Sequence, residues 1–482
     1  MIRKNYECCI IGAGPAGVGT ALELTQNGVS DILIIDKQTR IGGLSRTEIF
    51  EGTRFDVGPH RFFTKNKEIN HIWHETLGKD FIPVDRLTRI FYKKKLFNYP
   101  LKAGDALTKM GLFESAHAML SFAAAKFTPH KPAETFEDWI TEKFGRKIFE
   151  TFFKTYTEKV WGIPCNQIGA EWAAQRIKGL DLLEVIKNSF SFNKSNTPKS
   201  LVEQFDYPRY GAGQMYEAIA ARSVDKGAEL MLGATVKTIR RQDNQITSLL
   251  VTDADGNNIE VTAKHYFNSS PLTHFFTMVD PLETDEITRA AGALYYRDHI
   301  TVNLLIDGDN VFPDQWVYIH APDVYMARLA NYNNFSGNMV QGKKTALSVE
   351  YFVFRNDNIW SRSDQELISL AGDELAKSGL VERSRLEKGW VIRETESYPT
   401  YYLGYLDHYN ILKSAMDRYV NLTPIGRGGL YKYNNQDHSM YSGLLAARNY
   451  IGNQDIHYNL WNINIDAEYH ESSERETNDG EN

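Results

Sequence analysis

The chain has 482 residues, of which 42% are hydrophobic and 24% charged, and its formal net charge is -7. This length predicts about two to four structural units, and the composition is typical of a globular protein. The negative charge offers no basic surface for wrapping nucleic acid, and 3 cysteines are too few for a disulfide framework. We therefore expect a protein of the reducing cytoplasm without a nucleic-acid partner.

The first residues carry the pattern of a nucleotide-binding fold. An apolar run over residues 6–11 precedes Gly12, Gly14 and Gly17, and a helical pattern follows them. In this order the first glycine permits a tight turn, the second lets backbone N–H groups approach a pyrophosphate, and the third lets helix and strand pack closely. A second apolar run ends at Asp36, about 20 residues later, where a ribose hydroxyl needs an acceptor. The pattern predicts a dinucleotide site.

A second glycine turn follows Asp36 and helps to choose between NAD and FAD. The segment RIGGLSRT, residues 40–47, resembles the glycine pair found after the second strand of two-domain flavoproteins. An NAD site does not need this second turn, although the glycines could also belong to a plain loop. We therefore expect FAD as the cofactor.

The next part of the chain changes from strand to helix. Short strands are expected around the turn at Lys93, Lys94 and Lys95, and apolar residues recur at helical spacing from about 103 to 195. Farther along, strands dominate residues 298–400, apart from a helix near 364–378.

The end of the chain returns to a nucleotide-binding pattern. A strand over residues 421–426 leads into a glycine turn, and the polar octapeptide YNNQDHSM then precedes a helix. The remaining residues are acidic and poor in large apolar side chains, which predicts a disordered tail. No stretch reaches the ~18 uninterrupted apolar residues of a membrane span, so no membrane partner is expected.

These patterns predict an α/β fold with a Rossmann-type FAD-binding domain, as in two-dinucleotide-binding-domain flavoproteins, a helical insertion and a mixed β-sheet substrate domain. The expected units are a discontinuous FAD-binding domain (1–85, 203–273 and 418–465), a helical substrate-binding domain (103–202), a β-sheet substrate domain (86–102 and 274–417) and a disordered tail (466–482).

Five separated blocks resemble one family, the flavin-dependent UDP-galactopyranose mutases, with the eukaryotic-type and bacterial mutase-like members nearest. The blocks are GAGPAG with IGGLS, VGPHRFF, YTEKVWGIP with AAQRIKG, YMARLANYNNFSG, and GRGGLYKYNNQDHS. The glycine block is common among flavoproteins, whereas TEKVWGIP and NNQDHS are more specific. This chain has Gly58-Pro59-His60 where some mutases have Gly-Gly-His, and its segment between Arg427 and Asn435 is short. These departures leave the sugar and the nucleotide open.

The resemblance implies roles for individual residues. His60, Arg176 and Arg328 are the expected catalytic residues, with His60 beside the flavin and the arginines on the substrate diphosphate. The expected substrate contacts are Tyr99, Tyr156, Trp161, Arg176, Arg328, Tyr398, Tyr433 and Asn435. The expected cofactor contacts are Gly12, Gly14, Ala16, Gly17, Asp36, Lys37, Gly43, Leu44, Ser45, Gly58, Pro59, His60, Val236, Gly426, Arg427, Gln436, Asp437, His438 and Ser439. No metal is expected, since no metal-ligand spacing occurs.

Several of these residues also have a purely structural interpretation. Trp161 can simply fill a core, and His60 can be a buried histidine with its hydrogen bonds satisfied. Asp437 and His438 can form a helix-capping arrangement without chemistry.

The reaction implied by the resemblance interconverts pyranose and furanose forms of a UDP-galactose-like sugar nucleotide. It is redox-neutral but needs reduced FAD, because flavin N5 attacks the anomeric carbon; NAD(P)H is a candidate reductant. A homo-oligomer is left open. One alternative is a hydride-transferring oxidase of the amine oxidase, protoporphyrinogen oxidase or carotenoid desaturase kind. Another is a non-catalytic flavoprotein, or a partner within a glycan-assembly system.

Overall fold

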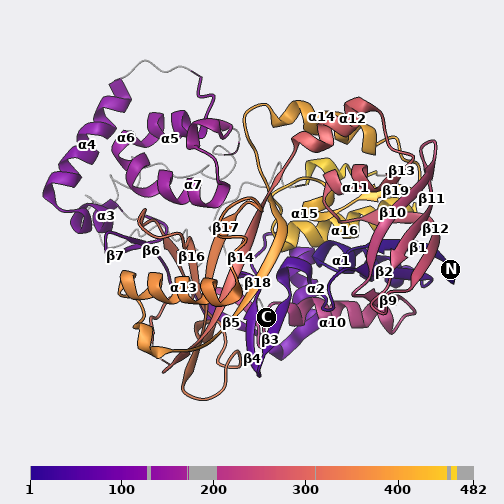
Figure 1. Cartoon of the computed structure of the whole chain (residues 1–482), viewed down its shortest axis with the longest axis horizontal. Helices are drawn as coiled ribbons and strands as arrows, with labels where there is room; N and C mark the ends of the chain where they lie inside the picture. Colours follow the sequence, from indigo (N-terminus) through magenta and orange to yellow (C-terminus); the bar gives the residue numbers. More distant parts are fainter. Residues whose placement is uncertain are drawn as a thin grey trace, which may run out of the picture.

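The computed structural model describes residues 2–101, 103–127, 132–170, 172, 204–309, 311–452 and 457–463. Two large sheets and a group of helices make up this part of the chain (Figure 1). The helical group lies at one end of the molecule, the eight-stranded sheet lies at the other, and the seven-stranded sheet lies between and below them. The α/β fold class predicted from the sequence is confirmed.

The eight-stranded sheet has the order β13-β10-β11-β12-β1-β2-β9, and β19 pairs with β12. Its strands are β1 (Ile2–Ile11), β2 (Ile32–Asp36), β9 (Glu229–Leu232), β10 (Thr235–Gln242), β11 (Gln245–Thr252), β12 (Asn258–Asn268), β13 (Val279–Asp280) and β19 (Leu422–Pro424). The parallel register sets Ile11 beside Ile35 and Asn268, and Asn268 beside Pro424. Four strands from distant parts of the sequence therefore end at one edge, where open α/β sheets bind ligands.

Helices cover this sheet so closely that glycine is required at their contacts. The covering helices are α1 (Pro15–Gln26) and α16 (Gln436–Ile451); α15 (Gly426–Gly429) packs against both, and α10 (Gly213–Val224) packs against α1. A Cβ on Gly443 of α16 would lie 2.1 Å from the Ala16 carbonyl oxygen of α1, and a Cβ on Gly19 would lie 2.9 Å from the Met440 carbonyl oxygen. The two helices could not keep this approach with larger residues, because real Cβ atoms do not come so near to backbone atoms.

The seven-stranded sheet has the order β18-β14-β17-β16-β15-β6-β7. Its strands are β6 (Thr88–Tyr92), β7 (Lys95–Asn98), β14 (Tyr296–Asp307), β15 (Trp316–Ile319), β16 (Arg328–Asn331), β17 (Lys344–Val353) and β18 (Leu386–Pro399). Lys93 and Lys94 form the predicted turn between β6 and β7, with φ 48 and 59. Helix α13 (Asp364–Ser378) covers one face through Leu367, Ala371 and Leu375, as its predicted position implied.

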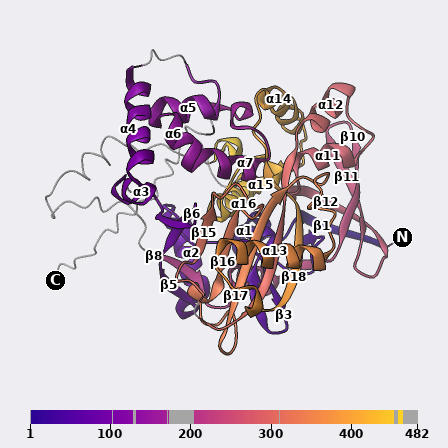
Figure 2. The same cartoon turned by 60° about the vertical axis from the view of Figure 1, so that its left-hand side comes forward.

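The helical group consists of short helices from one continuous part of the chain. They are α3 (Ala103–Met110), α4 (Leu112–Phe127), α5 (Phe136–Phe144), α6 (Arg146–Ile148) and α7 (Thr155–Trp161), with a π-helical turn over Phe149–Lys154 before α7. Thr135 and Asp138 form a capping box that starts α5. Turning the molecule keeps α4 at the outer edge of the group, away from both sheets (Figure 2).

The described residues also contain two small antiparallel two-stranded sheets and four further α-helices. The small sheets pair β3 (Thr47–Phe50) with β4 (Thr53–Asp56), and β5 (Phe81–Asp85) with β8 (Gln204–Pro208). The helices are α2 (Lys67–Leu77), α11 (Leu272–Met278), α12 (Asp285–Ala293) and α14 (Tyr405–Met416). No helix within the described residues is long and apolar enough to cross a bilayer.

One expected grouping differs from the structure. Residues 274–417 were expected to belong with the sheet substrate domain, but their two ends pack into the core of the eight-stranded sheet. Ile287 of α12 and Leu412 of α14 are buried in the same cluster as Ile10 and Phe267. The apolar faces of these helices face the nearest uncovered sheet surface, which sequence order alone does not reveal. The expected tail, 466–482, lies outside the described residues.

Candidate active site

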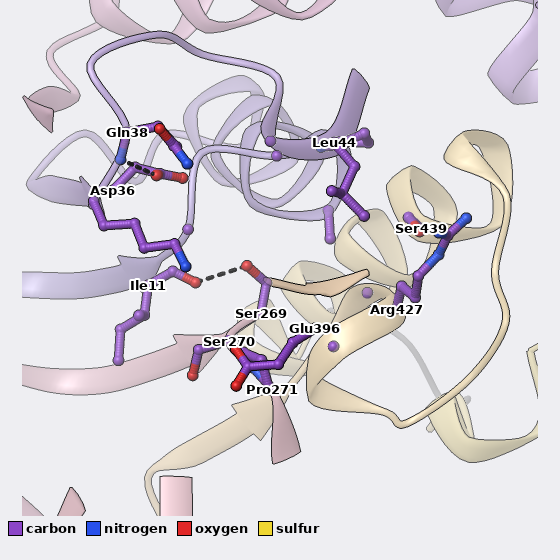
Figure 3. Close-up of a pocket in the computed structure, with 18 of the residues that line it drawn as sticks. Ile11, Asp36, Gln38, Leu44, Ser269, Ser270, Pro271, Glu396, Arg427 and Ser439 are labelled. Carbon is purple, nitrogen blue, oxygen red and sulfur yellow. Dashed lines mark hydrogen bonds between the residues drawn. The ribbon is translucent and has the colours of Figure 1, made fainter. Parts of the chain in front are cut away.

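A cavity of about 310 Å³ opens at the edge of the eight-stranded sheet where β1, β2, β12 and β19 end. Figure 3 shows its lining spread out from Asp36 and Gln38, past Ile11 and Ser269, to Arg427 and Ser439. The predicted cofactor residues on its wall are Gly12, Gly14, Ala16, Asp36, Lys37, Gly43, Leu44, Ser45, His60, Val236, Gly426, Arg427, Gln436 and Ser439. The structure thus brings residues from both ends of the chain to one elongated space.

Glycines form the narrow part of this cavity. Gly12 has φ +105, and a Cβ there would lie 2.0 Å from the Ser269 hydroxyl. Gly14 and Gly43 face each other, since a Cβ on Gly43 would lie 3.1 Å from the Gly14 Cα. Gly17 does not line the cavity; a Cβ there would lie 1.8 Å from the Gly12 carbonyl oxygen. It therefore keeps helix and strand close, as its place in the motif predicted.

Two helix N-termini open onto the same cavity. Gly14 is the N-cap of α1 and Asn435 is the N-cap of α16, and in neither helix does the N-cap side chain accept a hydrogen bond from the first-turn N–H groups. The first N–H groups of a helix lack partners within the helix, and the helix dipole makes this end positive. An anionic group such as a pyrophosphate is stabilised at this position.

Asp36 lies at the end of β2, where the sequence predicted an acceptor. Its carboxylate accepts hydrogen bonds from the backbone N–H groups of Ala13, at 2.6 Å, and Gln38, at 2.7 Å. Burial raises the pKa of Asp36, although these two N–H groups act in the opposite direction. A carboxylate has about four lone-pair sites, so acceptor capacity remains for a ribose hydroxyl.

Two arginines on the wall differ in how their charge is balanced. Arg46 is buried and paired with Glu48 and Glu394, and the Glu394 carboxylate keeps the Arg46 pKa raised against the effect of burial. Arg427 instead donates to backbone carbonyl oxygens of Asn434 and Ser397, at 2.6 to 3.1 Å. No carboxylate of the described residues forms an ion pair with Arg427, so its charge is available to an anion.

His60 lies on the cavity wall. Its Nδ1 is 2.8 Å from the Gly58 carbonyl oxygen, which can only accept, so Nδ1 carries the proton and Nε2 is left as an acceptor. Burial lowers the pKa of His60 to about 3, and the charges of Arg427 and Arg328 lower it further in the same direction. The imidazole is therefore neutral at pH 7 and lies in a positive field.

The predicted substrate aromatics gather beside this wall in one apolar cluster. Tyr398 and Tyr433 stack with ring centroids 5.3 Å apart, and the Arg427 guanidinium lies about 5 Å from both. Tyr156 of α7 is half-buried and belongs to the same cluster. Trp161 is 2% exposed and packs against Trp172, Tyr401 and Tyr433 in the cluster interior, so its side chain fills core space.

Tyr99 reaches this cluster indirectly. Its ring lies 5.0 Å from that of Tyr318, which in turn lies 5.2 Å from Tyr156. On its other face, Tyr156 stacks on His320 at 4.9 Å. Tyr99 therefore supports Tyr156 through Tyr318.

Arg328 lies at the junction of the cavity wall and the aromatic cluster. Its Nε and Nη2 donate to the two carboxylate oxygens of Glu350, which is 1% exposed, so the guanidinium is held as a bidentate pair. Gly58 packs against this pair: a Cβ there would lie 3.0 Å from Glu350 Oε1 and 3.6 Å from Arg328 Nη2. The remaining nitrogen, Nη1, has no hydrogen bond to a described residue and can bind a ligand.

The other predicted site residues fall into three groups. Gln436 joins two elements, since it accepts from the Tyr216 hydroxyl at 3.0 Å and donates to the Arg61 carbonyl oxygen at 2.9 Å. Pro59, Asp437 and His438 are not among the cavity-lining residues, and His438 Nδ1 lies 3.2 Å from Asp437 Oδ1. Arg176 lies outside the described residues.

Sequence reasoning missed several lining residues, among them Ser269, Ser270, Glu394 and Glu396. The end of β12 could have indicated the two serines, because it lies beside the end of β1 in a parallel pair. Glu396 has φ +59 and donates its N–H to Asp298 Oδ1 at 2.7 Å. Such a backbone is unfavourable outside glycine, and no local sequence pattern predicts it.

The residues present fit FAD. The glycine-lined gap admits a pyrophosphate near two uncapped helix N-termini, and the unpaired charge of Arg427 lies on the same wall. Asp36 offers an acceptor at the other end of the lining (Figure 3).

Comparisons with known proteins agree with this cofactor. The family model described as "Flavin containing amine oxidoreductase" matches residues 15–443, so the chain belongs to this family of flavoproteins. The chain is 27% identical over 173 residues to the "Probable UDP-galactopyranose mutase" of Klebsiella pneumoniae, covering 35% of this chain and 44% of that protein. It is also 27% identical over 166 residues to the "dTDP-fucopyranose mutase" of Escherichia coli, covering 33% and 43%. The matches span less than half of each relative.

A solved structure shares nearly the whole fold. The crystal structure of reduced UDP-galactopyranose mutase superimposes with a TM-score of 0.82 at 21% sequence identity, covering 95% of this chain and 99% of that chain. At this level of identity the similarity shows the fold.

Proposed function

We propose that this flavoprotein is a nucleotide-sugar mutase that interconverts the pyranose and furanose forms of a UDP-galactose-like sugar nucleotide. The mutases among its relatives support this proposal, since both are named for a sugar-ring reaction. The single observation that carries it is the positive field on the substrate side of the cavity. Glu350 pairs with Arg328 there, no carboxylate of the described residues forms an ion pair with Arg427, and both arginines lower the pKa of His60.

This field favours a diphosphate over a cation. Arg328 is oriented by Glu350, and its free Nη1 would bind a phosphate oxygen with a charge-assisted hydrogen bond. Arg427 would supply the second positive charge, and Arg176 would complete the clamp that the sequence predicted. As UDP leaves the sugar, these groups would stabilise the negative charge that develops on the diphosphate.

The aromatic residues would orient the substrate. The stacked Tyr398 and Tyr433 and the half-buried Tyr156 present ring faces and hydroxyl groups to a sugar nucleotide. Asn435 would add a polar contact at the start of α16. Trp161 would act indirectly, because its ring packs against Tyr433 and holds that residue in position. Holding the sugar in one orientation against the cofactor accounts for a large share of the rate gain in such a reaction.

The cofactor is proposed to act in its reduced form. Bound reduced FAD supplies a nucleophilic nitrogen for the anomeric carbon, so the chain itself needs no nucleophile. Neutral His60, with Nε2 as an acceptor, would receive a hydrogen bond on the cofactor side of the site. NAD(P)H is the proposed reductant, and the cytoplasm is the proposed location.

An amine oxidase-like activity is the second candidate, and membership of the flavin-containing amine oxidoreductase family supports it. Such an enzyme transfers a hydride from its substrate to oxidised FAD. A cationic amine would have to approach Arg328 and Arg427, which costs Coulomb energy in a partly buried site. The positive field therefore favours the mutase.

The deciding experiment compares the two reactions on one preparation. Dithionite-reduced protein is incubated with UDP-galactofuranose, and the conversion to UDP-galactopyranose is followed by anion-exchange chromatography. Oxidised protein is incubated with a panel of amines while hydrogen peroxide is measured. The proposal expects conversion in the first assay, dependent on reduction, and no peroxide in the second. Peroxide release without conversion would favour the oxidase, and binding without conversion would identify a non-catalytic protein.

A further inference from the structure

The turn between β15 and β16, residues 320–327, lies beside two of the proposed substrate contacts. Tyr318 and Arg328 are paired across the two strands at the base of this turn. His320, the first residue of the turn, stacks on the Tyr156 ring of α7, with 4.9 Å between the ring centroids and 6° between the ring planes. The turn therefore connects Tyr156 of the helical group with Arg328 of the seven-stranded sheet.

Lys159 of α7 binds both limbs of this turn. Its ammonium group donates to the backbone carbonyl oxygens of Ala321, at 2.7 Å, Met326, at 2.9 Å, and Ile319, at 3.4 Å. A lysine ammonium has three N–H donors, so all of them are used here. Lys159 follows Tyr156 by three residues, and residues with this spacing share one face of a helix. One face of α7 thus holds the turn at two points.

Glu374 of α13 binds the same turn through its N–H groups. This residue is buried, and its Oε1 accepts from the Tyr325 N–H at 2.5 Å, while its Oε2 accepts from the Met326 N–H at 2.9 Å. The Tyr351 hydroxyl also donates to Oε2, at 3.2 Å. Glu374 therefore holds the N–H of Met326, and Lys159 holds its carbonyl oxygen, two residues before β16 begins. Such charge-assisted hydrogen bonds are stronger than neutral ones.

We propose that Lys159 and Glu374 are positioning residues for the sugar nucleotide, because together they fix the conformation of the turn. The turn in its fixed form sets the distance between Tyr156 and Arg328. This inference rests on the proposed function, which places both of those side chains on the substrate. A small displacement of the groups that hold a substrate lowers the rate strongly. The proposal also gives a role to the lysine of the block TEKVWGIP, whose Trp161 fills core space.

The charge of Lys159 provides a measurement that distinguishes this role from plain packing. Burial lowers the pKa of Lys159 to about 8, and Glu374 and Asp323 act in the opposite direction. His320 also faces the ammonium group, and burial lowers its pKa to about 3, so it stays neutral above pH 7. Asp323 is paired in addition with Lys377, at 3.0 Å. A neutral Lys159 has two N–H donors for three carbonyl oxygens, so the turn should loosen above about pH 8.

The experiment measures the dissociation constant of UDP for the full-length, FAD-loaded protein by isothermal titration calorimetry from pH 7 to pH 9.5. Lys159→Met should weaken UDP binding about tenfold at pH 7 and keep its FAD, because the carbonyl oxygens lose their donors. The matched control is Lys377→Met, since Lys377 is half-exposed and donates to the Asp323 carbonyl oxygen at 2.6 Å, at the tip of the same turn. That variant should keep the wild-type affinity. Wild-type affinity should fall above about pH 8, and the fall should be absent in Lys159→Met.

Equal UDP affinity in Lys159→Met and the wild type overturns the proposal, and so does a fall above pH 8 that persists in Lys159→Met. If Lys159→Met does not fold, Glu374→Gln replaces it, and weaker UDP binding with retained FAD is again the expected result. A wild-type protein that binds no UDP contradicts the proposed function instead. Hydrogen exchange of the ligand-free protein then still tests the contacts: residues 319–328 should exchange faster in Lys159→Met than in Lys377→Met. Equal exchange in these two variants overturns the role of Lys159 in holding the turn.

Discussion

The cofactor cavity and the aromatic cluster are adjacent, yet they are built in different ways. The narrow part of the cavity consists of backbone: glycines at 12, 14 and 43 and two helix N-termini. The cluster consists of side chains, with Tyr156, Tyr398 and Tyr433 arranged around the Arg328–Glu350 pair. An added Cβ at Gly12 or Gly43 would come within 3.1 Å of a neighbouring atom, whereas a side-chain site depends on partners that can be exchanged together. The predictions below test this difference, starting with the largest expected effect.

The backbone site should fail when one methyl group is added at Gly12. In Gly12→Ala the new Cβ would lie 2.0 Å from the Ser269 hydroxyl at φ +105, so we expect at least about a 100-fold loss of FAD affinity. The matched control is Gly28→Ala, which has φ +87 but nothing within 4 Å of the new Cβ. That variant should keep FAD and lose only about 1 kcal/mol of unfolding free energy. Flavin absorbance and thermal unfolding measure both effects. If both variants lost FAD equally, the cause would be the backbone strain of alanine at positive φ and not the contact with the Ser269 hydroxyl.

The side-chain site should respond to its charge balance. Arg328→Ala leaves the Glu350 carboxylate buried without its partner, which costs about 3 kcal/mol of unfolding free energy and removes turnover of the sugar nucleotide, while FAD remains bound. The double variant Arg328→Met with Glu350→Gln should recover much of this stability but not the turnover. Chemical denaturation and the conversion assay separate the two quantities. If the double variant were as unstable as the single one, packing would be the source of the stability.

Gln436 lies on the cavity wall, and its removal should have an intermediate effect. Gln436→Leu breaks the hydrogen bonds with the Tyr216 hydroxyl and the Arg61 carbonyl oxygen. We expect about a tenfold weaker FAD affinity, because the loop that carries His60 loses its link to α16. Tyr216→Phe removes one of the two bonds and should have a smaller effect on FAD titrations. An unchanged affinity in Gln436→Leu would show that other contacts fix the loop.

The smallest expected effect concerns a histidine behind Tyr156. Burial lowers the pKa of His320 from 6.5 to about 3, so the unfolded chain binds a proton that the folded chain excludes as the pH falls below 6.5. The stabilisation is complete above pH 6.5 and decreases toward pH 3; at pH 6 the loss is about 1 kcal/mol. His320→Gln should therefore flatten the decrease in unfolding free energy between pH 7.5 and 6. If the variant kept the same decrease in unfolding free energy, other groups would be its cause, such as His299, whose pKa is also about 3.

The same contrast explains what the sequence could predict. The glycine pattern and the strand ending at Asp36 are local signals, and the structure places β1 and β2 accordingly. The helix expected after the octapeptide is present, but α16 already begins at Gln436, inside the octapeptide. The pairing of Arg328 with Glu350 joins β16 to β17, and nothing in the sequence near either residue indicates it. The sequence pattern also placed α12 and α14 with the seven-stranded sheet, although they pack on the eight-stranded sheet. An amphipathic helix can cover any of several sheet faces, and its sequence does not show which one. The roles of individual site residues remain predictions.

The edge at which β1, β12 and β19 end also sets an order of events during synthesis. Its cavity wall includes Ile11 from the beginning of the chain and Ser439 from near its end. A ribosome must therefore release all residues from Ile11 to Ser439 before the wall can close. A chain interrupted before α16 would leave the first glycine turn without its opposite wall, so we expect flavin loading to follow the synthesis of α16.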